Sequence, residues 1–252
     1  MFPILSGNSR DNGQIDDGRI IGGQAVNIAD VGWQVSIQED GYHFCGGSIL
    51  SDRWIVTAGI CFARDIVLSR ISVRAGSSKL TSGGTVKRLE AFFVHPQYNP
   101  QTQDNDAAVV RLSSPLSINS GSIRPIKLVN SGVELRGGTK VTVSGWGRLT
   151  ESPSELSPTL QGATITVIDN PTCQRYYVAD YVITDNMMCA GFIEGGKGPC
   201  QGDTGGPLVE GNKTLVGIIS WALGCARPAS PGVYTRLAST SVRNFIRSVT
   251  GL

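Results

Sequence analysis

The sequence predicts an all-β protein built from many short strands. It has 32 glycines and 12 prolines among 252 residues, so turns are frequent. Apolar and polar residues alternate at 34–37, 139–143 and 164–167, with the period of a half-buried strand. A hydrophobic content of 40% excludes a disordered chain, and this length allows one large β unit or two barrels.

Other segments deviate from this alternation in informative ways. Residues 1–19 are polar and predict an unstructured tail, and the apolar pattern begins at Ile20. The continuous apolar run at 215–220 predicts a buried strand. Near the end, the Ser-Thr-Ser cluster at 239–241 precedes apolar residues with helical spacing, which predicts one helix over Val242, Phe245, Ile246 and Val249.

Charge and hydropathy exclude several classes of function. Lys and Arg number 22 against 20 Asp and Glu, a net charge of +2 that indicates neither a nucleic-acid nor a membrane partner. No segment approaches the roughly 18 apolar residues of a membrane span. The first five residues are too weakly apolar for a signal core, so we expect that the sequence either lacks its leader or starts with added residues.

The cysteines indicate an oxidising compartment. Six is an even number, and no pair has the CxxC spacing of a metal site. We therefore predict three disulfides and secretion, with the pairing left open by the count alone, among Cys45, Cys61, Cys173, Cys189, Cys200 and Cys225.

Short motifs along the chain are specific enough to indicate a family. They are Arg19-Ile20-Ile21-Gly22-Gly23, His43-Phe44-Cys45-Gly46-Gly47-Ser48, Thr57-Ala58-Gly59-Ile60-Cys61, Asp106-Ala107-Ala108-Val109, Ser144-Gly145-Trp146-Gly147, Gly202-Asp203-Thr204-Gly205-Gly206-Pro207, Ser220-Trp221 and Pro231-Gly232-Val233-Tyr234. In this order they resemble the chymotrypsin-like (trypsin-type) serine proteases over residues 20–252. The residues at 184–189 resemble the mite group 3 allergens most, and among these the inactivated protease paralogues of the scabies mite.

This resemblance implies a fold and a disulfide pattern. The fold is two antiparallel six-stranded β-barrels with a C-terminal helix, divided into a pro-segment or tail at 1–19, a first barrel at 20–126 and a second barrel at 127–252. The implied pairs are Cys45 with Cys61, Cys173 with Cys189, and Cys200 with Cys225. Each closes a loop of about 15 to 25 residues, worth roughly 3 kcal/mol in the chain-entropy model.

The catalytic triad of the family is incomplete in this sequence. By resemblance, Ile60 stands at the place of the general-base histidine and Thr204 at the place of the nucleophilic serine, while Asp106 keeps the carboxylate. An isoleucine side chain accepts no proton, and a threonine hydroxyl without a base is a weak nucleophile. Losing the base or the nucleophile costs about 10⁶ in turnover, so we expect no enzyme activity.

Other polar residues near these motifs receive structural roles. We expect Asp106 to be a buried acid satisfied by backbone N–H groups and Ser220. The only histidines, His43 and His95, lie in core or loop patterns of the family and are expected to be structural. The backbone N–H groups of Gly202 and Thr204 resemble an oxyanion hole.

The specificity pocket also departs from trypsins. The place of the pocket-base Asp is taken by Gly198, and Ala222 replaces a glycine at the pocket mouth, while Gly232 is retained on the opposite wall. We expect a narrowed, uncharged pocket that does not receive Arg or Lys.

The activation machinery resembles that of the family. Arg19-Ile20 resembles the cleavage site, and Asp203 resembles the acid that receives the freed ammonium. The segment 74–88 contains no acid, so we expect no calcium site, no other metal and no cofactor. Asn212 begins an Asn-Lys-Thr sequon at a predicted hairpin tip and is a candidate for glycosylation.

The sequence is compatible with three functions. The first is a secreted, monomeric, inactive protease homologue that binds proteins of a host cascade, with complement components as the suspected partners by resemblance. The second is a non-catalytic cofactor in an endogenous zymogen cascade. The third is a residual serine-type endopeptidase.

Overall fold

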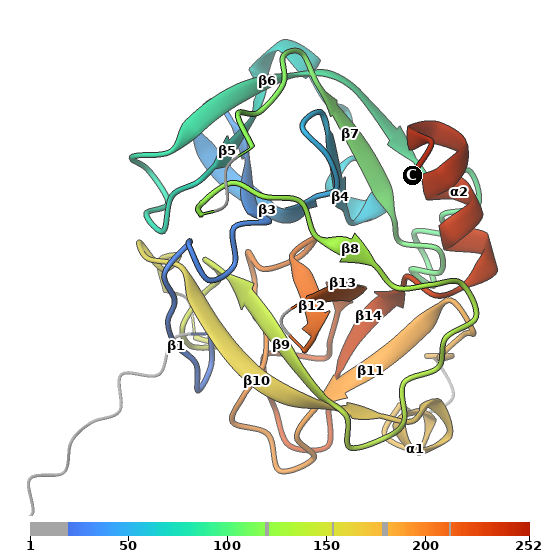
Figure 1. Ribbon diagram of the computed structural model, residues 1–252. Coiled ribbons are helices and arrows are strands. Elements are labelled where there is room, and N and C mark those ends of the chain that lie inside the picture. Colours follow the sequence, from blue (N-terminus) through green and yellow to red (C-terminus); the bar gives the residue numbers. More distant parts are fainter. Residues whose placement is uncertain (1–19, 119–120, 153, 178–180, 212) are drawn as a thin grey trace, which may run out of the picture.

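Two closed, six-stranded antiparallel barrels stack one above the other (Figure 1). The computed structural model describes residues 20–118, 121–152, 154–177, 181–211 and 213–252. The two barrels and the C-terminal helix confirm the predicted fold. The boundary at 126/127 between the two predicted units stays a prediction.

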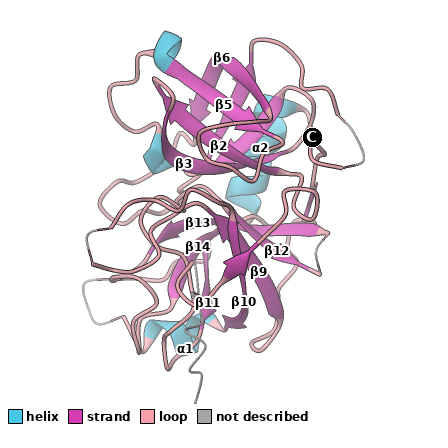
Figure 2. Ribbon diagram, turned by 90° about the vertical axis from the view of Figure 1, so that its left-hand side faces the viewer, coloured by secondary structure: helices cyan, strands magenta, loops and turns pink. Residues whose placement is uncertain are grey.

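The first barrel, the upper one in Figure 2, closes through neighbouring hydrogen-bonded strands. In the order of the ring these are β2 (Gln34–Glu39), β3 (Tyr42–Ile49), β4 (Trp54–Thr57), β7 (Ala108–Leu112), β6 (Thr85–Val94) and β5 (Ile71–Ala75). Two short 3₁₀ turns interrupt the chain at Gly59–Cys61 and Leu68–Arg70.

The second barrel closes where its first two strands pair with each other. Its ring is β9 (Lys140–Gly145), β10 (Gln161–Ile168), β11 (Met187–Gly191), β14 (Gly232–Arg236), β13 (Thr214–Trp221) and β12 (Pro207–Glu210). Two short strands extend this sheet: β1 (Gln24–Ala25) pairs with β10, and β8 (Lys127–Leu128) runs parallel to β13. A five-residue helix, α1 (Asn170–Gln174), follows β10.

One predicted strand is buried on both faces. The alternation at 34–37 predicts a half-buried strand, but in β2 the polar Gln34 and Ser36 are as buried as the apolar residues between them. Their polar atoms are satisfied, because Ser144 of the second barrel donates to Gln34 Oε1 (2.6 Å) and the Ser36 hydroxyl contacts the His43 ring (2.8 Å). The Ser144 contact ties the two barrels together.

The predicted C-terminal helix forms as α2 (Thr240–Thr250). Ser239 is its N-cap and accepts a hydrogen bond from the backbone of Val242, as Ser does at helix starts. Val242, Phe245 and Ile246 are buried on one face. The ring of Phe245 lies 4.9 Å from that of His95, so α2 packs on the first barrel although it follows the second.

Three disulfides join the six cysteines in the pairing that the resemblance implies: Cys45–Cys61, Cys173–Cys189 and Cys200–Cys225. Cross-links of this number are typical of secreted proteins. No helix in the described part of the chain is long and apolar enough to span a membrane.

Candidate functional site

An open cavity of about 470 Å³ is lined by Ile60 and Thr204, two of the three residues that the sequence placed at the triad. Ile60 lies on the 3₁₀ turn that follows β4 of the first barrel, and Thr204 and Ser220 come from the second barrel. Residues far apart in sequence therefore meet in a cleft to which both barrels contribute. Gln103 also lines this cleft; its only sequence signal was its nearness to Asp106.

Asp106 is buried beneath this cleft with a hydrogen bond to each carboxylate oxygen. The backbone N–H of Ile60 donates to Oδ1 (2.7 Å), and the Ser220 hydroxyl donates to Oδ2 (2.5 Å). Burial raises the pKa of Asp106 to about 6, against the opposing effect of these hydrogen bonds and one from Gly59. The acid thus contacts the backbone of residue 60, while the imidazole that it would orient in a complete triad is absent from that side chain.

The two side chains above Asp106 differ from those of a complete triad. The hydrocarbon side chain of Ile60 is 37% exposed in the cleft. Thr204 is half-buried, and its carbonyl oxygen accepts a hydrogen bond from Gly46 N (2.8 Å). Among the described residues no side chain forms a hydrogen bond with the Thr204 hydroxyl.

Both histidines are engaged elsewhere. His43 Nε2 lies 2.7 Å from the carbonyl oxygen of Gly202, and burial lowers the pKa of this ring. His95 Nε2 contacts the Ser241 hydroxyl at 3.2 Å. Neither ring is positioned to take a proton from Thr204, which fits the structural roles expected for them.

The loop before Thr204 is held by a buried carboxylate. Asp203 is fully buried and accepts hydrogen bonds from Gly147 N (2.7 Å) and Cys200 N (3.0 Å). Burial raises its pKa to about 6. Gly202 has φ +96°, a conformation that favours glycine and sets the backbone of the oxyanion-hole candidate.

The activation segment packs against the same part of the second barrel. Ile20 is fully buried, and Ile21 forms a β-bridge with Gly198. The described contacts of Asp203 include none with Ile20. Arg19 lies outside the described residues, so cleavage between Arg19 and Ile20 stays a prediction.

Gly198, Ala222 and Gly232 line one small cavity of about 10 Å³, which is room for about one water molecule. No acid lines it, so nothing there would pair with a substrate Arg or Lys. The expectation of an uncharged lining needs one correction, because Lys197 also contributes to it. The Lys197 stem also lies against Gly22 of the activation segment.

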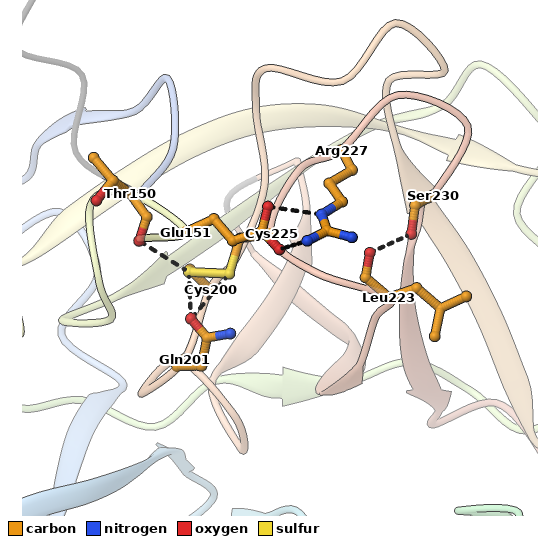
Figure 3. A network of polar contacts seen from close by, with 8 residues as sticks. All are labelled: Thr150, Glu151, Cys200, Gln201, Leu223, Cys225, Arg227 and Ser230. Carbon is orange, nitrogen blue, oxygen red and sulfur yellow. Dashed lines mark hydrogen bonds and ion pairs between the residues drawn. A yellow bond between two sulfur atoms is a disulfide. The ribbon is translucent and has the colours of Figure 1, made fainter. Parts of the chain in front are cut away.

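Polar contacts hold the segment 222–231, part of which lines this pocket (Figure 3). Arg227 forms an ion pair with Glu151 (2.6 Å), and the Ser230 hydroxyl donates to the carbonyl oxygen of Leu223 (2.9 Å). The Cys200–Cys225 disulfide joins the same segment to the loop of Thr204. Asn212, the glycosylation candidate, lies outside the described residues.

Comparisons with known proteins place this geometry in a family. The family model named Trypsin matches residues 20–246. Trypsin 5G1 of Aedes aegypti is 44% identical over 236 residues, covering 93% of this chain and 86% of the relative. Trypsin of Phaedon cochleariae is 41% identical over 222 residues (87% and 84%), and Trypsin-3 of Salmo salar is 40% identical over 236 residues (92% and 93%).

These relatives overturn the expectation that the chain is not an enzyme. That expectation followed from Ile60 and Thr204 alone. Relatives named trypsin at this identity over most of the chain point to serine endopeptidases instead. The family match over residues 20–246, the two barrels and the three disulfides agree with one another, and the chain belongs to the trypsin-like serine protease family.

Proposed function

We propose that this chain is a residual serine-type endopeptidase that binds protein segments in the cleft between its barrels and hydrolyses them slowly. The observation that carries the proposal is the ordered loop at Gly202 to Thr204, fixed by the buried Asp203. Such a loop presents backbone N–H groups to the oxyanion that forms at the scissile carbonyl.

The proposed rate follows from the groups present. In serine proteases that lack triad members, binding and the oxyanion hole alone leave a rate about 10³ to 10⁴ above that in water. Attack by the Thr204 hydroxyl would add to this background, so the part of the rate that Thr204→Ala removes measures it. Thr204 has no imidazole beside it, so its proton would pass to water when its hydroxyl attacks the carbonyl carbon. The amine that leaves would take a proton from water. A water molecule would then hydrolyse the acyl ester on Thr204, which releases the carboxylic acid and restores the Thr204 hydroxyl.

The proposed substrate has a small, uncharged side chain at the residue before the scissile bond. A space of about 10 Å³ beside Lys197 suits glycine or alanine and disfavours Arg or Lys. The experiment is a fluorogenic peptide panel with Ala, Gly, Arg or Lys at that residue, using protein cleaved between Arg19 and Ile20. A Thr204→Ala variant purified in parallel identifies contaminating proteases.

The expected result is a weak signal for Ala and Gly that Thr204→Ala lowers. A signal of trypsin strength after Arg or Lys would contradict the pocket assignment. Hydrolysis that is equal in Thr204→Ala, or no hydrolysis at all, would contradict the proposed reaction.

A second proposed function is retention of a partner protein in the same cleft. It is favoured by apolar side chains left exposed: Ile60 in the cleft is 37% exposed, and elsewhere on the second barrel Tyr181 is 41% exposed with its ring 5.6 Å from that of Trp221. Aromatic side chains dominate the energetics of protein contacts. Proteins of a host proteolytic cascade, complement components first, are the proposed partners of a secreted monomer, and the likeness to scabies mite paralogues belongs to this proposal.

A complement deposition assay with the purified protein tests this second function. The expected result is reduced deposition, weakened by Ile60→Asp in the cleft and unchanged by the same kind of substitution at exposed Val86 of the first barrel. No inhibition and no binding of complement components at micromolar protein would reject it. Binding of proteins from the animal's own zymogen cascade instead would favour the cofactor alternative.

A further inference from the structure

A larger cavity lies apart from the cleft, at α1 and the adjoining strands of the second barrel. It has a volume of about 520 Å³ and shares no lining residue with the cleft or the small pocket. Figure 1 shows α1 at the end of the second barrel that points away from the first barrel. Ligand sites in proteins have volumes of about 300 to 1,000 Å³, so this cavity is large enough for a small organic molecule.

The inner lining of this cavity is apolar. It includes Val129, Leu135, Val167, Met188 and Val216. Four of these, Val129, Val167, Met188 and Val216, belong to the buried core of the barrel, so their positions are fixed by packing. A lining of this kind accommodates a hydrocarbon chain or ring.

One lining residue of the cavity is a cation whose hydrogen bonding is incomplete. Arg236 of β14 lines it, and its side chain is 23% exposed. Its Nε is buried and has no hydrogen-bond partner among the described residues. Its Nη1 reaches Glu134 Oε1 only at 3.4 Å, and the Glu134 side chain is 81% exposed. Because Nε is buried, a carboxylate in the cavity would meet the two Nη groups of the guanidinium, whose N–H donors match its two oxygens.

Three acids also line the cavity, and their negative charges act against the binding of an anion. Asp169 caps α1 and accepts a hydrogen bond from Thr172 N (2.9 Å), which together with the Thr172 side chain lowers its pKa. Asp185 and Glu134 are exposed, where water and salt screen their charges. Arg236 is therefore the charged group least surrounded by solvent, and its acidic partner Glu134 is exposed and 3.4 Å away.

We propose that this cavity binds an anionic amphiphile, a single-chain carboxylate of the fatty-acid class. The hydrocarbon chain lies along the apolar lining, and the carboxylate accepts hydrogen bonds from the Nη groups of Arg236 in place of Glu134. This site is separate from the cleft, so its test does not depend on the proposed peptidase activity.

The test is isothermal titration calorimetry with dodecanoate below its micellar concentration, with dodecylamine and acetate as comparison ligands. We expect dodecanoate to bind one per chain and acetate not to bind. Arg236→Met weakens dodecanoate binding at least tenfold. Glu134→Gln tightens it several-fold, because the competing carboxylate is gone. The matched control, Glu90→Gln, removes an acid from an exposed ion pair with Arg111 and leaves binding unchanged.

Three results of the titrations would overturn the proposal. Dodecylamine binding as tightly as dodecanoate would show that the acids decide the ligand, and would overturn the proposal. So would the absence of dodecanoate binding, or an Arg236→Met variant with the original affinity and thermal midpoint. If Arg236→Met does not fold, Glu134→Gln decides alone: affinity no higher than in Glu90→Gln rejects the site.

Discussion

Asp106→Asn is expected to stabilise the protein at neutral and alkaline pH. The carboxyl of Asp106 is buried, and its pKa is raised from 3.8 to about 6. At about 1.4 kcal/mol for each tenfold change in proton affinity, ionised Asp106 costs about 3 kcal/mol of folding free energy. No imidazole offsets this cost, because Ile60 contributes only its backbone N–H.

The protein loses stability as the pH rises because Asp106 ionises at a lower pH in the unfolded chain than in the folded one. The unfolded chain loses this proton near pH 4 and the folded chain near pH 6, so the free energy of unfolding falls as the pH rises through that interval and stays lower above it. Asparagine keeps an oxygen for the N–H of Ile60. Its amide can donate to Ser220, whose hydroxyl rotates to accept.

The assay is guanidinium denaturation of both proteins between pH 4 and pH 8. We expect Asp106→Asn to gain about 2 to 3 kcal/mol at pH 8 relative to its difference at pH 4. Asp65→Asn, which changes an exposed acid, serves as the control. A stability difference between Asp106→Asn and the original chain that is the same at both pH values would refute the argument.

Three further predictions concern the cleft, the loop below it and the helix cap. Ile60→His combined with Thr204→Ser restores a base and a serine, and should raise kcat/KM for an Ala substrate by about 10³ or more, with Arg substrates remaining poor; an unchanged rate would contradict this prediction. Gly147→Ala places a methyl group 2.4 Å from the carboxylate of Asp203 and should cost about 3 kcal/mol in denaturant unfolding; a fully stable variant would show that the carboxylate moves freely. Ser239→Ala removes the N-cap of α2 and should cost about 1 kcal/mol by the same measurement, whereas an unchanged midpoint would assign the helix start to packing alone.

Much of the fold followed from patterns in the sequence. The apolar run at 215–220 lies within β13. The apolar residues with helical spacing after Ser239 form α2, in which Phe245 is buried. The alternation of apolar and polar residues predicted burial less completely. It marks one face of β2 as apolar, but it cannot show that Gln34 on the other face meets Ser144 of a distant strand.

The candidate site was predictable only where side-chain chemistry is local. The sequence identified Ile60, Asp106 and Thr204, and the structure brings their segments together. The size of the small pocket and the entry of Lys197 into its lining depend on how separate loops pack, which no motif records. The cavity at Arg236 was missed for the same reason, since its lining comes from strands and loops spread over the second half of the chain.

The two ends of the described chain are exchanged between the barrels. β1, near the start, pairs with β10 of the second barrel, and α2, at the end, packs on β7 of the first. Each closed barrel therefore carries on its outside a segment that belongs, in chain order, to the other barrel. Unfolding of one barrel therefore removes a segment that packs on the other. We expect a single cooperative melting transition, and removal of α2 should lower the stability of both barrels.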